Sequence, residues 1–232
     1  LPSVESLRSI ELQIPLRIYS SDAKLIAEFG EMRRSPIAFD DIPKNFIHAL
    51  LAAEDDNFAN HHGVDPGSLL RAAAQILKTG RIQTGGSTIT MQVAKNFFLS
   101  SERSFSRKAN EILLALQIER ELTKDEILEL YINKIYLGNR AYGIEAASQV
   151  YYGKSIREIS LAEMAMIAGL PKAPSRFNPI VNPTRSMERR NWILGRMFKL
   201  GRISEQDYKE AVAEPLSARL HIAAPDIYAP YI

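Results

Sequence analysis

Apolar residues recur at helical spacing along most of this chain. In one segment Phe46, Leu50 and Ala53 fall on a single face, as they do in a helix that buries one side. The same spacing predicts further helices that begin at residue 65, cover 87–99, 106–122 and 123–134, run from 160 to before 171, cover 186–200 and begin at 204. The pattern therefore predicts a mainly α fold.

Residues 9–30 alternate instead with the period of two that strands have. Leu16 and Ile18 belong to the first alternating run, and the stretch from Lys24 to Phe29 forms the second. Ser20-Ser21-Asp22 supplies a turn between them. We expect a short N-terminal β-hairpin.

Several helix ends can be predicted from local residue types. Asp41 can cap a helix that has Pro43 in its first turn. Thr123–Glu126 and Ser160–Glu163 have the capping-box pattern, in which two side chains satisfy free backbone N–H groups. The prolines between 171 and 183 predict an irregular connection.

Composition narrows the class of protein. The chain has 232 residues, of which 46% are hydrophobic and 24% charged, as in ordinary globular domains. A net charge of +2 gives nucleic-acid binding no support, and the absence of cysteine excludes disulfides and cysteine nucleophiles. No run of 18 apolar residues suggests a membrane span. Because the sequence begins at Leu1, we expect an excised piece whose membrane anchor has been removed.

Glu54 is the first candidate for chemistry. It ends the apolar run Ala49–Ala53, and partial desolvation raises the pKa of a carboxyl group toward the value that a general acid or base needs. A helix-end carboxylate satisfied by backbone donors or by an arginine is the alternative. His61 and His62 are adjacent without metal-ligand spacing, so local hydrogen bonding is the better interpretation for both.

A second candidate is the turn Gly85-Gly86-Ser87-Thr88, which opens a helix. The first N–H groups of a helix bind anions, and Thr88, Gln92 and Lys95 share one face of this helix. The alternative is an ordinary Ser N-cap followed by a solvated face.

Arg107 and Glu111 are spaced as a helix ion pair, which on a surface would contribute little. Lys95, Arg103 and Lys108 add cations nearby, however, and apolar residues interleave with them. These apolar residues are Phe97, Phe98, Leu99 and Phe105. Such a mixture suits contact with anionic lipid, although a buried core is an equal alternative for the aromatic residues.

Read jointly, these segments resemble the family-51 transglycosylases, the glycosyltransferase domains of class A penicillin-binding proteins. The resemblance covers about residues 35–200 and rests on five motifs. Their matching positions here are Glu54, Asp55, Phe58, His61 and Gly63; Gly85, Ser87, Thr88, Thr90, Gln92, Lys95 and Asn96; Arg107, Lys108, Glu111, Ala115 and Glu119; Tyr131, Asn133, Gly138, Tyr142, Gly143, Ala146 and Ala147; and Arg189, Arg190 and Met197.

The resemblance implies a lysozyme-like glycosyltransferase fold with a smaller membrane-proximal lobe. It divides the chain into a hairpin and linker from a missing anchor (1–35), the glycosyltransferase domain (36–213) and the start of a linker toward an absent transpeptidase domain (214–232). It also implies a location on the periplasmic face of a bacterial inner membrane.

The implied reaction is polymerisation of lipid II into β-1,4 glycan, with release of undecaprenyl pyrophosphate. Glu54 would be the general base, and Glu111 would orient the pyrophosphate, with a divalent cation (Mg or Mn) as an optional aid and no other cofactor. The implied substrate-binding residues are Asp55, Phe58, His61, Ser87, Thr88, Gln92, Lys95, Asn96, Arg107, Lys108 and Asn133.

The implied partners are lipid II and the growing glycan, the membrane surface, moenomycin-type inhibitors and cell-wall synthesis proteins. Two alternatives stay open. A muramidase would use Glu54 as a general acid but would give the cations no role. A non-catalytic membrane-docking scaffold would need none of the acidic and basic motif positions, all of which are present.

Overall fold

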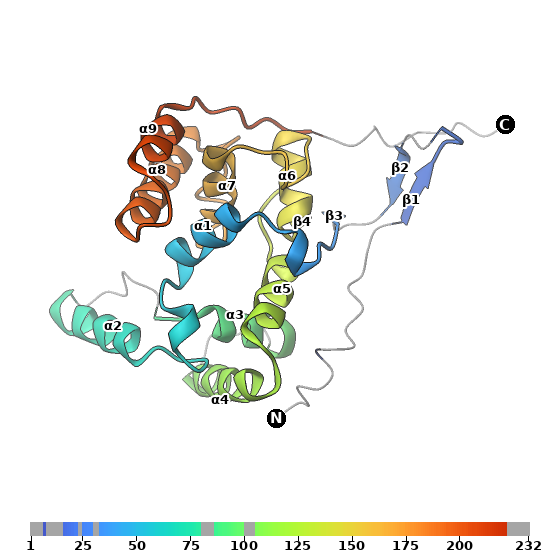
Figure 1. The fold of residues 1–232 in the computed structure, drawn as a ribbon. Helices are drawn as coiled ribbons and strands as arrows, with labels where there is room; N and C mark the ends of the chain where they lie inside the picture. The colour runs from blue at the N-terminus through green and yellow to red at the C-terminus, as the bar shows by residue number, and fades with distance from the viewer. Residues whose placement is uncertain are drawn as a thin grey trace. The chain divides into compact units, whose positions relative to one another are not determined.

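The structure is a computed structural model, and it describes residue 7 and residues 16–22, 25–29, 33–79, 86–99 and 105–221. Helices dominate the described chain (Figure 1). They are α1 (Lys44–Glu54), α2 (Pro66–Thr79), α3 (Ile89–Phe98), α4 (Phe105–Glu121), α5 (Lys124–Lys134), α6 (Ile144–Tyr152), α7 (Leu161–Ala168), α8 (Pro183–Lys199) and α9 (Glu205–Ala213). The predicted mainly α fold is confirmed.

The strands form two small sheets. β1 (Leu16–Tyr19) and β2 (Leu25–Phe29) pair antiparallel, which confirms the N-terminal hairpin. β3 (Arg33–Arg34) and β4 (Ala141–Tyr142) pair in parallel, and the sequence pattern does not predict this pairing because each strand has only two residues.

Two of the three predicted helix caps form. Both capping boxes form, at Thr123 with Glu126 and at Ser160 with Glu163. The expectation for α1 is wrong: Asp41 ends a short 3-10 helix, and the carbonyl of Pro43 accepts the first helical hydrogen bonds instead. The proline holds the backbone at the angle that a helix start needs, so no side-chain cap at position 41 is required.

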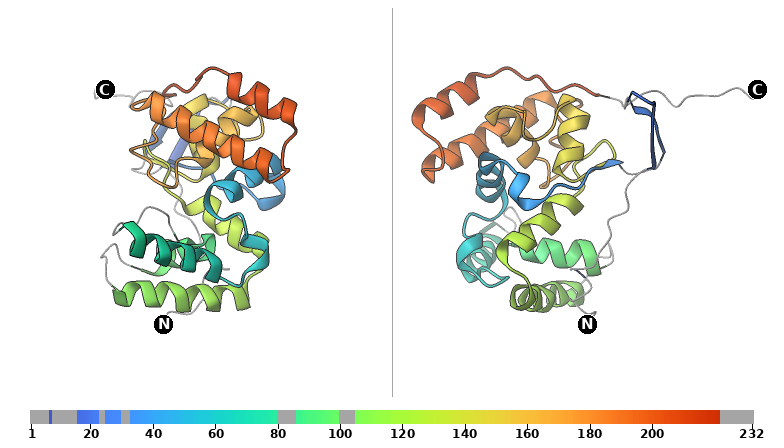
Figure 2. Two further views of the ribbon diagram at one scale, coloured as in Figure 1. Left: turned by 90° about the vertical axis from the view of Figure 1, so that its left-hand side faces the viewer. Right: turned by 45° about the vertical axis from the view of Figure 1, so that its right-hand side comes forward.

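The chain divides into two compact units, and each is described here by itself. The first comprises residues 1–11 and 54–132. In it α3 packs against α4 (Figure 2). Ile89, Met91 and Val93 of α3 and Leu114 and Ile118 of α4 are fully buried in this core.

The second unit comprises residues 12–53 and 133–232. Here α8 packs against α7 and α9 (Figure 1). Arg190 of α8 is 2% exposed, and it donates to the carbonyls of Val212 and Glu214 at the end of α9. Arg189 and Arg196 donate in the same way to Ala53 and Ala52 in the last turn of α1. Helix ends that lack their own hydrogen-bond partners are satisfied by these guanidinium groups.

The segment that follows α9 packs against α6 within the second unit. Backbone N–H groups of Arg219 and His221 donate to the carbonyls of Tyr151 and Val150 in α6, at 3.0 and 2.8 Å. The predicted boundaries at 35/36 and 213/214 and the membrane-proximal lobe stay predictions. Among the described residues, no helix combines the length and apolar character that crossing a lipid bilayer requires.

Gly63 tests how closely the first unit is packed. Its φ is +86°, and an added Cβ would lie 2.6 Å from the backbone oxygen of Ala115 in α4. At Gly201, where φ is +66°, an added Cβ would meet nothing within 4 Å. Gly201→Ala therefore isolates the backbone cost, about 1 kcal/mol. We expect Gly63→Ala to lower the free energy of unfolding by at least about 2 kcal/mol more than Gly201→Ala does, as measured by urea unfolding. Equal losses would contradict this packing.

Candidate functional site

Glu54 is the last residue of α1 and is half-buried. Ala49, Leu50 and Ala52 before it are buried, as the apolar run predicts. The amide nitrogen Nε2 of Gln92 in α3 donates to Glu54 Oε2 at 3.2 Å. A carboxylate that is half-buried and held by a neutral donor is suited to exchange a proton with a substrate group.

Tyr131 completes this hydrogen-bond chain from α5. Its hydroxyl donates to Gln92 Oε1 at 3.1 Å, and its side chain is fully buried. Burial raises the pKa of the Tyr131 hydroxyl well above its usual range, and the charges of Glu54 and Asp55 raise it further. Tyr131 was not among the predicted site residues, and its only sequence signal was its position in the fourth motif.

The residue after Glu54 has a different role. Asp55 is 8% exposed, and its Oδ2 accepts a hydrogen bond at 3.0 Å from the backbone N of Ile89, the first residue of α3. The same carboxylate meets Nε2 of His61, which is 5% exposed, at 3.0 and 3.1 Å. Asp55 and His61 therefore tie the loop after α1 to the N-terminus of α3.

Thr88 is also engaged by the protein. It is the N-cap of α3: its hydroxyl accepts from the backbone N of Met91 at 3.1 Å and donates to the carbonyl of Gly63 at 2.6 Å. With 2% of its surface exposed, Thr88 does not share a solvated face with Gln92 and Lys95. The expectation of one polar stripe holds for the latter two alone, because the cap turns the Thr88 hydroxyl back into the protein.

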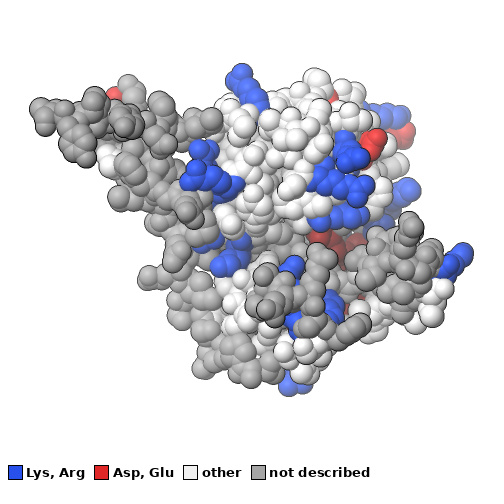
Figure 3. Space-filling view, turned by 180° about the vertical axis from the view of Figure 1, so that it is seen from behind, with Lys and Arg blue, Asp and Glu red and all other residues white. Residues whose placement is uncertain are grey.

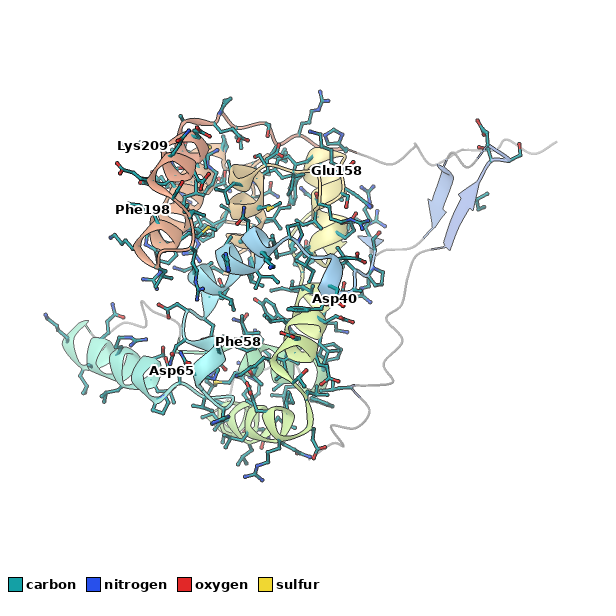
Figure 4. All side chains as sticks on the ribbon, in the orientation of Figure 1. Asp40, Phe58, Asp65, Glu158, Phe198 and Lys209 are labelled. Atoms are coloured by element: carbon teal, nitrogen blue, oxygen red, sulfur yellow. The ribbon has the colours of Figure 1, made fainter. Side chains whose placement is uncertain are left out.

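Lys124 joins two further motif positions. Its ammonium donates to the carbonyl of His61 and to Glu119, each at 2.7 Å, and lies 4.2 Å from the ring centroid of Phe58. Phe58, labelled in Figure 4, is 2% exposed. Phe58 thus supports the loop that carries Asp55 and His61. For Phe58, Asp55, His61 and Thr88, substrate contact stays a prediction.

A cation group lies on α4 and the turn before α3. Lys108 Nζ donates to Ser87 Oγ at 2.7 Å and to Glu111 Oε2 at 2.8 Å. Arg107 Nε lies 3.4 Å from Glu111 Oε1. Glu111 is only 3% exposed, so this is no ordinary surface ion pair. A buried carboxylate needs such partners, and here it fixes two cations in place.

Lys95 and Asn96 are exposed on α3, and the Lys95 ammonium makes no hydrogen bond or ion pair within the described part of the chain. Gly85, Arg103 and the side chain of Phe105 lie outside the described residues.

Asn133 belongs to the second unit. Its side-chain oxygen accepts a hydrogen bond from the backbone N of Ile37 at 2.9 Å, and its side-chain nitrogen donates to the carbonyl of Ile37 at 2.8 Å. The structure thus gives Asn133 a role in holding the fold, and its predicted substrate contact remains untested.

The described surroundings of Glu111 do not fit a divalent cation. Both carboxylate oxygens face positive side chains, those of Arg107 and Lys108. Nowhere in the described ranges do three or more His, Asp or Glu side chains gather as metal ligands would. Arg107 and Lys108 thus lie where a metal ion on Glu111 would have to bind.

The chain is similar in sequence to known proteins over nearly all of its length. Residues 22–198 match the profile of a family described as Transglycosylase. Penicillin-binding protein 1A of Pseudomonas aeruginosa is 76% identical over 232 residues, which are 100% of this chain and 28% of that protein. Penicillin-binding protein 1A of Escherichia coli K12 is 51% identical over 100% of this chain and 27% of its own length.

A crystal structure of penicillin-binding protein 1A from Haemophilus influenzae has the same fold, with a TM-score of 0.54 and 36% identity. The match covers 92% of this chain and 22% of that one. The chain thus spans about a quarter of the length of the relatives that it matches. Residues 124–147 and 169–174 predict a likeness to the 1A group, and the matches over the whole chain confirm that likeness.

Thr88 separates a structural role from substrate contact. Thr88→Val removes the cap hydroxyl and should lower the free energy of unfolding by about 1–2 kcal/mol, whereas Thr88→Ser keeps the hydroxyl and most of the stability. Urea unfolding followed by circular dichroism measures both. A Thr88→Val chain as stable as wild type would show that the hydroxyl does not hold α3.

Proposed function

Because the chain belongs to the transglycosylase family, we propose that it is a peptidoglycan glycosyltransferase that polymerises lipid II into β-1,4 glycan strands and releases undecaprenyl pyrophosphate. The observation that supports this most is the combination, within one compact unit, of Glu54 held by Gln92 with the cations of Arg107 and Lys108 fixed by buried Glu111. A base and an anion site are the two parts that this transfer needs.

In the proposed reaction Glu54 takes the proton from the 4-hydroxyl of the acceptor sugar. The resulting oxygen attacks the anomeric carbon of the growing glycan, and the bond from that carbon to the pyrophosphate oxygen breaks. Lys95, Arg107 and Lys108 stabilise the charge that develops on the leaving pyrophosphate. A single displacement inverts the anomeric centre, so an α-linked pyrophosphate gives a β linkage.

The remaining site residues assist in this scheme. Ser87 is held by Lys108 at 2.7 Å and lies just before α3, where backbone N–H groups favour anions. Asn96 is exposed next to Lys95 on α3, and its contact with the substrate stays a prediction. Glu111 acts by aligning Arg107 and Lys108, not by exchanging a proton.

The muramidase and scaffold alternatives are not favoured by the family match. One assay distinguishes all three: incubation of the chain with labelled lipid II, followed by gel electrophoresis. Polymer ladders support the proposal. Shortening of preformed glycan without ladders would indicate a muramidase, and no change in either substrate would indicate a scaffold.

We further propose that α2 lies against the membrane on which the lipid substrate resides, at the periplasmic face of the inner membrane. Leu70 and Leu77 are 73% and 89% exposed and, being seven residues apart, share one face of α2. Arg71 and Lys78 beside them are exposed cations, which favour anionic headgroups. On the face seen in Figure 3, the coloured charged side chains are mostly Lys and Arg.

Glu54→Gln should abolish polymerisation and leave the thermal midpoint of unfolding close to that of wild type. Glutamine has the same shape, but it cannot accept the proton of the acceptor hydroxyl. The lipid II gel assay measures the change. If the variant kept half of the wild-type turnover, Glu54 would not be the base.

Lys95→Ala and Arg107→Ala should each lower turnover by about 100-fold, the usual scale for loss of a preorganised charge stabiliser. Both should also weaken binding of a moenomycin-type phosphoglycolipid. Lys209→Ala is the matched control, because the partner of Lys209 among the described residues is the exposed Glu205 on the same helix, α9. Unchanged inhibitor affinity in both test variants would show that the pyrophosphate does not bind at Lys95 and Arg107.

Leu70→Ser combined with Leu77→Ser should reduce co-sedimentation of the chain with anionic vesicles, and binding should weaken as salt rises. The control combines Val181→Ser with Leu200→Ser, at 70% and 42% exposed positions of the second unit. Phe98 and Leu99 are half-buried, so they are less suitable for this test. Equal vesicle binding by both double variants would contradict docking through α2.

A further inference from the structure

Side chains from three helices form one hydrogen-bond chain that ends at the proposed base, Glu54. It runs from the Tyr131 hydroxyl on α5 to Gln92 Oε1 on α3 over 3.1 Å, and from Gln92 Nε2 to Glu54 Oε2 over 3.2 Å. All three residues belong to the first compact unit. Gln92, which donates to the proposed base, is therefore itself held by Tyr131.

The direction of this chain is fixed by what each group can donate. An ionised carboxylate only accepts hydrogen bonds, so the amide nitrogen of Gln92 must face Glu54. The amide oxygen of Gln92 must then face Tyr131, and the Tyr131 hydroxyl must donate to it. A rotated amide would place its oxygen against the carboxylate, where two acceptors repel.

Tyr131 meets the requirement for a permanent donor. Its side chain is fully buried, and burial together with the nearby carboxylates holds the pKa of its hydroxyl well above the usual range. The proton therefore stays on Tyr131 throughout the pH range in which an enzyme works. A buried hydroxyl also loses much if its acceptor turns away, which adds to the restraint on Gln92.

We propose that Tyr131 and Gln92 are positioning residues for the base: Tyr131 locks the amide of Gln92, and Gln92 holds the Glu54 carboxylate ionised and aimed. This inference rests on the proposed function, in which Glu54 accepts the acceptor's proton. It gives Gln92 a task different from the contact with phosphate and sugar that the resemblance implies.

Other charged groups near Glu54 bear on its ionisation. Asp55 follows it in the chain and is paired with His61 at 3.0 Å. Lys95 lies one turn beyond Gln92 on α3, and Tyr131 on α5 donates its hydrogen bond to Gln92. Neither Tyr131→Phe nor Gln92→Met changes a formal charge, so both variants leave these electrostatic neighbours in place.

The test compares the pH dependence of kcat/KM for lipid II polymerisation in wild type, Tyr131→Phe, Gln92→Met and the double variant. Loss of either donor destabilises the ionised base, so the acidic limb of the profile should move to higher pH. At the low-pH end kcat/KM should fall by about 10- to 100-fold, a usual cost of misaligning a reacting group, and by less on the high-pH plateau. The double variant should lose little more than Gln92→Met alone, because both changes break one chain.

Tyr151→Phe is the matched control. Tyr151 is also fully buried and donates its hydroxyl to a backbone oxygen, that of Leu137 at 2.9 Å, but it lies in the second unit. Its loss should lower stability without moving the acidic limb. Binding of a moenomycin-type phosphoglycolipid should persist in Tyr131→Phe, which would show that the anion site is intact.

A profile for Tyr131→Phe that coincides with that of wild type would overturn the inference. So would a uniform loss at every pH that Tyr151→Phe reproduces, because that is the effect of reduced stability. Failure of wild type to form any polymer would overturn the proposed function instead. Thermal unfolding would then still test the coupling between Tyr131 and Gln92. Additive destabilisation by Tyr131→Phe and Gln92→Met would show that the two side chains are not coupled.

Discussion

The buried carboxylate of Asp55 is the constraint on which the rest of the first unit depends. It binds the backbone N of Ile89 and the ring of His61, so the end of α1 and the start of α3 cannot separate. Glu54 immediately precedes it, and Gln92 lies one turn into α3. Asp55 therefore adds a second link between the end of α1 and α3 to the one that the Gln92–Glu54 hydrogen bond makes, and a buried carboxylate of this kind is costly to leave without its partners.

A second buried carboxylate, that of Glu111, holds the cations. Positive side chains near one another repel, and a protein that gathers them for an anionic ligand must hold them while the ligand is absent. Glu111, which is 3% exposed, pairs with Arg107 and Lys108 and so holds both cations in place. The carboxylate that we propose as the base and the cations of Arg107 and Lys108 thus have separate supports, Gln92 with Tyr131 for the first and Glu111 for the second.

Local features of the fold could be predicted from the sequence, and links between distant segments could not. Helical spacing and the capping boxes at Thr123 and Ser160 involve residues within one turn of each other, and both boxes form as expected. Asp55 meets Ile89 across 34 positions, and Tyr131 meets Gln92 across 39. Spacing carries no information on such pairs, so the motifs predicted a substrate contact for Asp55 and assigned no role to Tyr131, and the hydrogen bonds that each makes could not be predicted.

The most direct test of this account is a crystal structure of the Glu54→Gln chain with a polyprenyl-pyrophosphate-linked disaccharide bound. The account predicts that pyrophosphate oxygens contact Lys95 and the guanidinium and ammonium groups of Arg107 and Lys108. It also predicts that Gln92 still donates to residue 54 and remains bonded to Tyr131. A pyrophosphate bound away from α3 and α4, with these three cations in solvent, would contradict the central claim.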